Sequence, residues 1–190
     1  YNVIPGKPLP PAMLEDNLDD VLAGAANLRK HIEIVREFGV SPVVALNVFP
    51  TDHPGEIDAV RKVAEAAGAH FASSTHVVDG GDGAIDLAHA VVAACDHKAD
   101  FRYTYDLEDS LVEKLTKVAT KVYGADGIDI APAAAKELAH FEDLGYGTFP
   151  VVIAKTHLSL SHDPSLKGAP TGWRLPVREV RAAVGAGYIY

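Results

Sequence analysis

Cysteine is almost absent from the sequence, which contains only Cys95 among its 190 residues. A single cysteine cannot form an internal disulfide, so the fold has to rest on a hydrophobic core, and the composition fits a reducing compartment. Cys95 falls on the apolar side of an expected helix. We therefore expect a buried, unreactive thiol at this position.

Long apolar runs and an excess of positive charge are also missing. No run approaches the roughly 18 residues that a membrane-spanning helix needs, and no secretory signal is recognisable, so we expect a cytoplasmic protein. With 17 Lys and Arg against 26 Asp and Glu, the net charge is −9. This charge argues against nucleic acids and anionic membranes as partners but leaves room for a small anionic ligand in a locally basic pocket.

Several catalytic and cofactor motifs are missing as well. The only Gly-Lys pair, Gly6-Lys7, is not followed by Ser or Thr, so the sequence contains no P-loop, and the dinucleotide-binding glycine pattern is absent too. The nine histidines lack the spacing of zinc ligands, and no Ser-His-Asp or Cys-His arrangement is legible. We therefore assign no metal site and no catalytic residue.

What the sequence does contain is a regular alternation of helical and strand patterns. Apolar residues spaced three and four apart predict helices, often closed by a glycine, at residues 16–38, 56–67, 85–95, 106–123 and 132–144. Continuous apolar or β-branched runs predict strands at residues 42–46, 70–73, 101–103, 128–130 and 149–154, with one or two more in 174–190. The alternation predicts an α/β fold with a mixed, mostly parallel sheet and helices on both faces.

The length fits one domain or two small lobes that share a sheet. We divide the chain into an extended linker or strand at residues 1–13, an α/β lobe at 14–100 and a second α/β lobe at 101–190. The start, Tyr1-Asn2-Val3-Ile4, lacks an initiator Met, and residues 185–190 resemble a strand cut midway. We therefore expect a piece of a longer protein, truncated at its C-terminus.

Polar and aromatic residues follow three of the expected strands, where ligands bind in open α/β sheets. After the first strand, Asn47 and Asp52 fit either a turn with a helix cap or a ligand contact. Phe49, beside Pro50, is either a satellite core residue or a flat wall for a ring-shaped ligand. His76 follows the second strand and lies near the rim of this expected site.

Two further segments bear on anion binding. Lys155 and Thr156 follow a strand and combine a point charge with a hydrogen-bond donor, although a surface lysine without a role is the alternative. The glycine-rich turn 79–83 precedes a helix, which suggests an anion site. Its two aspartates oppose a phosphate, so a turn with a helix cap is favoured there.

Long motifs in the same order resemble the formate–tetrahydrofolate ligase family. The motifs span essentially the whole chain and include residues 27–33, 43–52, 79–88, 105–110, 122–127, 141–147, 154–156 and 163–172. The resemblance implies the C-terminal portion of a larger P-loop-type enzyme, in which the P-loop domain precedes the region matched here.

The resemblance also implies an activity. The family uses ATP to join formate to tetrahydrofolate through formyl phosphate, giving 10-formyltetrahydrofolate, with Mg²⁺ accompanying ATP and a monovalent cation assisting. It implies a homotetramer, ATP bound mainly by sequence absent here, and a role for this segment in completing the folate site. The isolated chain is expected to be inactive because it has no P-loop. The alternative is a non-catalytic fragment with only a folate-binding or oligomer-assembly role.

The resemblance finally implies particular site residues. Phe49, with Pro50, falls on the family motif that packs one face of the pterin ring. Relatives carry a tryptophan over the other face, and here Val77 occupies its place. Losing one stacking partner costs on the order of 1 kcal/mol, or about fivefold to tenfold in affinity. The remaining rim of the expected site consists of Asn47, His76, Lys155 and Thr156.

Overall fold

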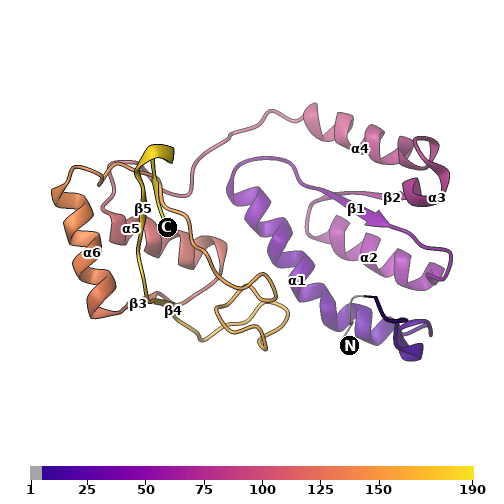
Figure 1. Cartoon of the computed structure of the whole chain (residues 1–190). Helices are drawn as coiled ribbons and strands as arrows, with labels where there is room; N and C mark the ends of the chain where they lie inside the picture. Colours follow the sequence, from indigo (N-terminus) through magenta and orange to yellow (C-terminus); the bar gives the residue numbers. More distant parts are fainter. Residues whose placement is uncertain (1–5) are drawn as a thin grey trace. The chain divides into compact units, whose positions relative to one another are not determined.

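The computed structural model describes residues 6–190, and these residues form two compact units that divide the chain between Phe101 and Arg102 (Figure 1). The first five residues of the expected extended segment at 1–13 lie outside the described residues. Farther along, Pro11–Met13 is a short 3-10 turn rather than extended chain.

The first unit begins with a long helix, α1 (Leu18–Glu37). The side chain of Asn17 caps α1 by accepting a hydrogen bond from the backbone N–H of Asp20 at 3.1 Å, which supplies one of the partners that a helix start lacks. The chain turns after the helix at Gly39, whose φ of 73° favours glycine. A β-carbon there would overlap the carbonyl of Asp100, so the sequence has a second reason for glycine at this stop.

The centre of the first unit is a parallel strand pair. β1 (Val43–Asn47) and β2 (His70–Ser74) pair in register from Val43↔His70 to Asn47↔Ser74, and α2 (Pro54–Ala66) connects them. Ile32 of α1 and Ala64 of α2 form a core with Val44 and Phe71. The predicted helices and strands of this region are confirmed.

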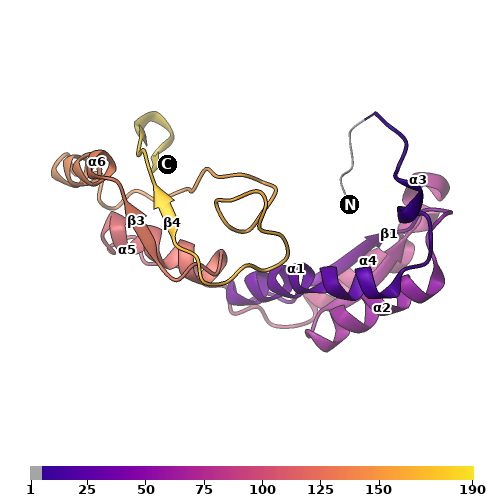
Figure 2. The same cartoon turned by 90° about the horizontal axis from the view of Figure 1, so that it is seen from below.

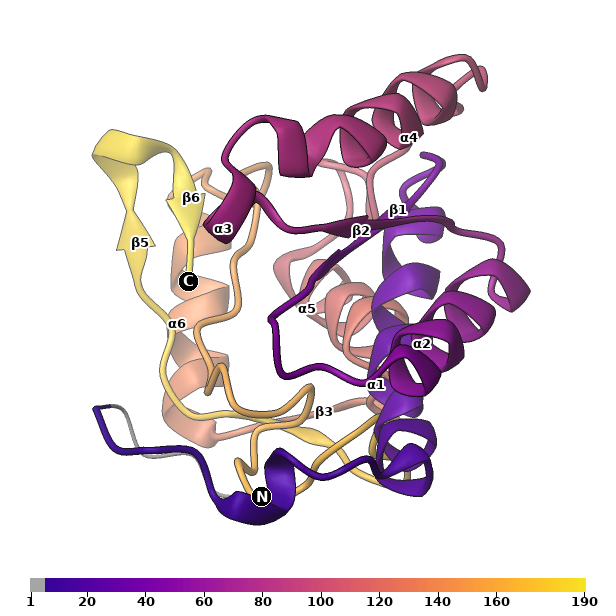
Figure 3. The same ribbon diagram turned by 90° about the vertical axis from the view of Figure 1, so that its right-hand side faces the viewer.

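Beyond β2 the chain makes a short helix, α3 (His76–Asp79), a 3-10 turn at Asp82–Ala84, and then α4 (Ile85–Cys95), as Figure 3 shows. α4 packs against β2. The expectation of a buried Cys95 is wrong, because this thiol is exposed. The apolar pattern correctly located the helix, but within the described residues no segment covers the outer side of α4, which contributes no buried residue.

The second unit opens with α5 (Leu111–Lys117), which continues as one π-helical stretch, Val118–Val122. Ser110 caps α5 and forms a capping box with Glu113, so the helix begins at Leu111 and the predicted start at residue 106, with Asp106 as its cap, is wrong. Asp106 instead donates its N–H to Oδ2 of Asp109 in the preceding turn. β3 (Ile128–Ile130) and α6 (Pro132–Asp143) follow as predicted.

β4 (Leu175–Val177) pairs in parallel with β3, and the two arrows lie side by side in Figure 2. A short antiparallel hairpin of β5 (Ala182–Ala183) and β6 (Tyr188–Ile189) closes the unit around a 3-10 turn at Val184–Ala186. The core includes Leu111 and Leu115 of α5, Leu138 of α6, and Ile189.

The buried side chain of Lys114 stabilises the turn at residues 147–149. Lys114 of α5 is 0% exposed, and its Nζ donates to the carbonyl of Gly147 at 2.5 Å and to that of Phe149 at 3.1 Å. Burial lowers the pKa of Lys114. The two carbonyls thus supply polar partners in a site where water has been removed.

Two predicted strands of this region are absent. The segment 149–154 forms only a single bridge, Val151↔Ile189, and residues 101–103 are in no strand. A strand requires a paired neighbour, which a local pattern does not reveal. The α/β class with parallel pairs is confirmed, but the described strands form three separate two-stranded sheets rather than one shared sheet. No helix in residues 6–190 is long and apolar enough to cross a membrane.

Candidate functional site

Two loops leave the same edge of the strand pair in the first unit. Because β1 and β2 are parallel and Asn47 pairs with Ser74, the loops that follow them both start at the carboxyl edge. The N–H of Val48 donates to the carbonyl of Ser74 at 2.9 Å and joins the two loops at their base. This is the edge where the sequence predicted a site.

The first loop presents an aromatic ring on a fixed backbone. Asp52 accepts a hydrogen bond from the N–H of Phe49 at 2.9 Å through Oδ2, and its own N–H donates to the carbonyl of Phe49 at 3.0 Å. Phe49 is nevertheless 50% exposed, and Pro50 beside it is exposed as well. The alternative of a satellite core residue is wrong within this unit.

The second loop is closed by Ser74, Thr75 and Gly83. Ser74 is 1% exposed, and its hydroxyl donates to the carbonyl of Gly83 at 3.3 Å and lies 2.9 Å from Nδ1 of His76. The N–H of Thr75 donates to the same carbonyl at 3.0 Å. A β-carbon on Gly83 would lie 2.6 Å from Oγ1 of Thr75, so this closure requires glycine.

The closed loop holds α3 with its apolar side chains outward. Val77 is 63% exposed and Val78 is 65% exposed. The sequence prediction missed both α3 and the anchoring role of Ser74. A signal was present, since a serine ending an apolar strand just before a glycine-rich turn is a ready side-chain partner for the turn.

The electrostatics of this edge are acidic. Asp52, Asp79 and Asp82 are all exposed on the two loops. His53 follows Asp52 and lies 3.0 Å from the carbonyl of Leu14 through Nε2, and this hydrogen bond raises the pKa of His53. The carboxylates disfavour a phosphate here and favour a ligand that offers hydrogen-bond donors.

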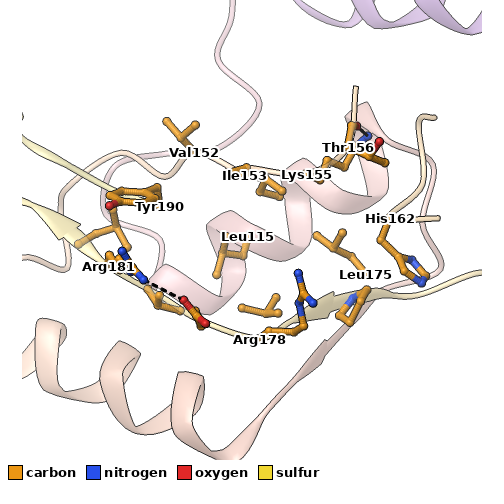
Figure 4. A pocket seen from close by; sticks show the side chains of 16 residues that line it. Leu115, Val152, Ile153, Lys155, Thr156, His162, Leu175, Arg178, Arg181 and Tyr190 are labelled. Carbon is orange, nitrogen blue, oxygen red and sulfur yellow. Dashed lines mark hydrogen bonds and ion pairs between the residues drawn. The ribbon is translucent and has the colours of Figure 1, made fainter. Parts of the chain in front are cut away.

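The other two rim residues lie in the second unit. Lys155 donates through Nζ to the carbonyl of Thr156 at 3.1 Å and, in a short contact, to that of Ser159, and it lies 4.7 Å from the centroid of the Tyr123 ring. Desolvation lowers the pKa of Lys155. Lys155 and Thr156 line a cavity of about 600 Å³ (Figure 4).

The structure thus gathers the predicted site residues into two groups. One edge of the first unit carries Asn47, Phe49, Pro50, His76 and Val77, while Lys155 and Thr156 belong to a cavity in the second unit. Within residues 6–190 no group of three or more His, Cys, Asp or Glu side chains has the geometry to hold a metal ion.

Comparison with known proteins extends over nearly the whole chain. The family model described as formate–tetrahydrofolate ligase matches residues 4–190. Proteins named formate–tetrahydrofolate ligase are 97% identical in Cutibacterium acnes, 60% identical in Saccharopolyspora erythraea and 50% identical in Herpetosiphon aurantiacus. Each match covers 100% of this chain but 34% of the relative, so the chain spans about a third of the length of these curated relatives.

Proposed function

Because this chain belongs to the formate–tetrahydrofolate ligase family, we propose that it is part of an ATP-dependent ligase that joins formate to tetrahydrofolate. The proposed reaction passes through formyl phosphate and gives 10-formyltetrahydrofolate. In this proposal the present segment completes the folate site with the two loops that follow β1 and β2.

The observation that carries the folate-site role is the exposed ring of Phe49. Hydrogen bonds with Asp52 fix its backbone while half of the side chain remains open to a ligand. Val77 leaves the same strand edge with 63% exposure. A flat heterocycle placed between Phe49 with Pro50 and Val77 gains apolar contact on both of its faces.

The acidic character of the edge supports a pterin rather than a phosphate as its ligand. A pterin carries amino and ring N–H groups, which are donors that carboxylates such as those of Asp52 and Asp79 accept. Asn47 and His76 supply further polar groups at the rim. Orienting the pterin in this way holds the folate amine for attack on the formyl carbon.

The other requirement of the proposed reaction is to stabilise the phosphate group of formyl phosphate. Formate is a poor electrophile, and phosphorylation turns one of its oxygens into a leaving group, which hydrogen-bond donors and cations stabilise. Lys155 and Thr156 are the contributors of this segment. In this proposal, ATP with Mg²⁺ is bound mainly by the two thirds of the ligase that lie outside this chain. A monovalent cation assists the reaction. The working form is a homotetramer in the cytoplasm.

The test begins with the intact mass of the product of the natural gene compared with 20.1 kDa. A larger protein should formylate tetrahydrofolate in a reaction that requires both formate and ATP. The 190-residue chain alone should bind tetrahydrofolate in calorimetry without forming product. A larger protein without formate-dependent product would refute the ligase proposal, and a natural product of 20.1 kDa would leave only folate binding or assembly.

The outer side of α4 favours a second role in oligomer assembly. Ile85 and Val92 lie seven residues apart on one helix side and are 49% and 62% exposed, and their neighbour Val91 is 45% exposed. Exposed apolar patches of this kind mark protein contacts. A second copy is the partner we propose, so Val92→Asp should reduce self-association of the chain in sedimentation equilibrium. A monomeric parent chain would exclude this role.

A further inference from the structure

The cavity of the second unit is lined by apolar side chains on one part of its wall and by cationic side chains on another. Leu115 of α5, Ile153, and Leu175 of β4 form part of its wall, and its volume is about 600 Å³ (Figure 4). This volume lies within the usual range of about 300–1,000 Å³ for small-molecule sites and exceeds what a bare inorganic anion fills.

Lys155 brings a positive charge to this wall without a carboxylate partner. Its Nζ donates to the carbonyls of Thr156 and Ser159 and lies over Tyr123, and within the described residues it forms no ion pair. Desolvation, with no opposing acidic group, lowers the pKa of Lys155. A partly buried ammonium whose partners are all neutral gains most from an added anion.

Arg178 adds a second cation to the same space. It follows β4 directly, lines the cavity, and points from the strand into the open space in Figure 4. Among residues 6–190 it makes no ion pair or side-chain hydrogen bond, whereas nearby Arg181 donates to Glu179 at 3.2 Å. The charge of Arg178 is therefore available to a ligand, while that of Arg181 is already balanced.

From these contacts we propose that the cavity binds an oxyanion carried on an apolar group, with Lys155 and Arg178 holding the carboxylate or phosphate and Leu115, Ile153 and Leu175 contacting the apolar part. The size of the space selects an organic anion over free phosphate, and the apolar wall selects a ring or branched chain over a sugar. Lys155 is also the residue proposed above for the anion of the ligase reaction, but binding in this cavity requires neither ATP nor folate and is tested without them.

A tryptophan next to the cavity can report ligand binding through its fluorescence. His162 lines the cavity, and its ring centroid is 5.8 Å from that of Trp173. Trp173 is the single tryptophan of the sequence and is 6% exposed. A ligand that displaces His162 or changes the local charge therefore changes the fluorescence of one known side chain.

The test titrates the 190-residue chain with benzoate, phenyl phosphate, inorganic phosphate and neutral benzamide, using calorimetry for affinity and Trp173 fluorescence for location. We expect saturable binding of benzoate and phenyl phosphate, and binding of benzamide and of inorganic phosphate at least about tenfold weaker. The ratio of benzoate to phenyl phosphate affinity tells whether the site prefers a carboxylate or a phosphate.

Substitutions separate the proposed site from general charge effects. Arg178→Met and Lys155→Met should each weaken benzoate about tenfold or more, since each removes one charged partner. Lys136→Met, on an exposed position of α6, makes the same change in net charge outside the cavity and should leave affinity unchanged. Arg178 is exposed and forms no ion pair or side-chain hydrogen bond among residues 6–190, so its variant keeps the test valid if Lys155→Met fails to fold.

Three results would overturn the inference. The first is no heat and no fluorescence change up to about 10 mM of either aromatic anion. The second is equal affinity for benzamide and benzoate, which would remove the role of charge. The third is an equal loss in Lys136→Met and Arg178→Met, which would place binding outside the cavity.

Discussion

Phe49 and Asp52 exchange two hydrogen bonds, one from the N–H of Phe49 to Oδ2 of Asp52 at 2.9 Å and one from the N–H of Asp52 to the carbonyl of Phe49 at 3.0 Å. The pair fixes the loop backbone before any ligand arrives, so binding need not order this segment. The ring of Phe49 remains 50% exposed, which leaves an apolar surface available at a preorganised position.

Replacing Phe49 by Ala should therefore weaken folate binding specifically. We expect the KM for tetrahydrofolate in the full-length enzyme to rise about fivefold to tenfold, because one aromatic wall is lost, with the KM for ATP nearly unchanged. Steady-state kinetics with each substrate varied in turn measures both values. Leu144→Ala, which truncates a side chain 52% exposed in the other unit, is the control. Unchanged folate kinetics would refute the role of Phe49 as a pterin wall.

Val77→Trp should have the opposite effect. The resemblance to relatives implies a tryptophan at this position, and Val77 is 63% exposed with room for a larger ring. Restoring a second aromatic face should raise the affinity for tetrahydrofolate about fivefold to tenfold. Calorimetry measures the affinity, and Val78→Trp, on the 65% exposed neighbouring residue, serves as the matched control. An equal gain in both variants would point to nonspecific apolar binding.

The closure of the second loop predicts a contrast between two glycines. Gly83→Ala places a β-carbon 2.6 Å from Oγ1 of Thr75 and 2.9 Å from the backbone nitrogen of His76, so the loop has to shift, at a cost of about 1–3 kcal/mol. Gly81→Ala meets no atom within 4 Å and has a helical φ of −60°. We expect thermal unfolding and folate titration to show losses for the first variant alone.

The opposite result for this glycine pair would be informative about the loop. If Gly83→Ala retained both stability and folate affinity, the hydrogen bonds of Ser74 and Thr75 to the Gly83 carbonyl would not be what positions α3. Val77 would then have to be held in another way.

The ion pair of Asp109 and Lys117 predicts acid sensitivity of the second unit. Lys117 donates to Oδ2 of Asp109 at 2.5 Å, and this hydrogen bond lowers the pKa of Asp109 below its ordinary value. A carboxyl group with a lowered folded-state pKa stabilises the fold above its unfolded-state pKa, and that contribution disappears as the pH falls through the folded-state pKa.

Urea unfolding between about pH 6 and about pH 2 should therefore show falling stability in the acid range, with a shallower fall in Asp109→Asn. The free energy of unfolding should differ between parent and variant at neutral pH and converge in acid. A constant difference at every pH would mean that the Asp109 charge does not contribute. Glu179→Gln, which removes the exposed partner of Arg181, is the control.

Much of the local structure followed from the sequence. The spacing that ends at Gly39 and Gly68 predicted α1 and α2, and both glycines have positive φ in the structure. The continuous apolar run at β1 predicted a strand, and the parallel partner β2 follows α2 as expected. These features depend on residues close together in the chain, so a local pattern is sufficient to find them.

Other features required knowledge of distant neighbours. The run 149–154 resembles a strand as strongly as β1 does, yet it forms only the bridge Val151↔Ile189. Cys95 lies on an apolar helix side as predicted but is exposed, since nothing in residues 6–190 covers that side. Pairing and burial are properties of two segments, and the sequence of one segment cannot report them.

The candidate site shows the same division. The sequence alone determined which residues were proposed for the candidate site, including Phe49, Pro50 and Val77. Strand ends and family motifs consist of residues that are consecutive in the chain, so they can be recognised without a structure. The tertiary structure decided that the loops after β1 and β2 meet at one edge, that Ser74 and Gly83 close the second loop, and that Lys155 lies with Arg178 in a cavity. The reason is physical, since exposure, hydrogen-bond partners and uncompensated charge depend on groups brought together from distant parts of the chain.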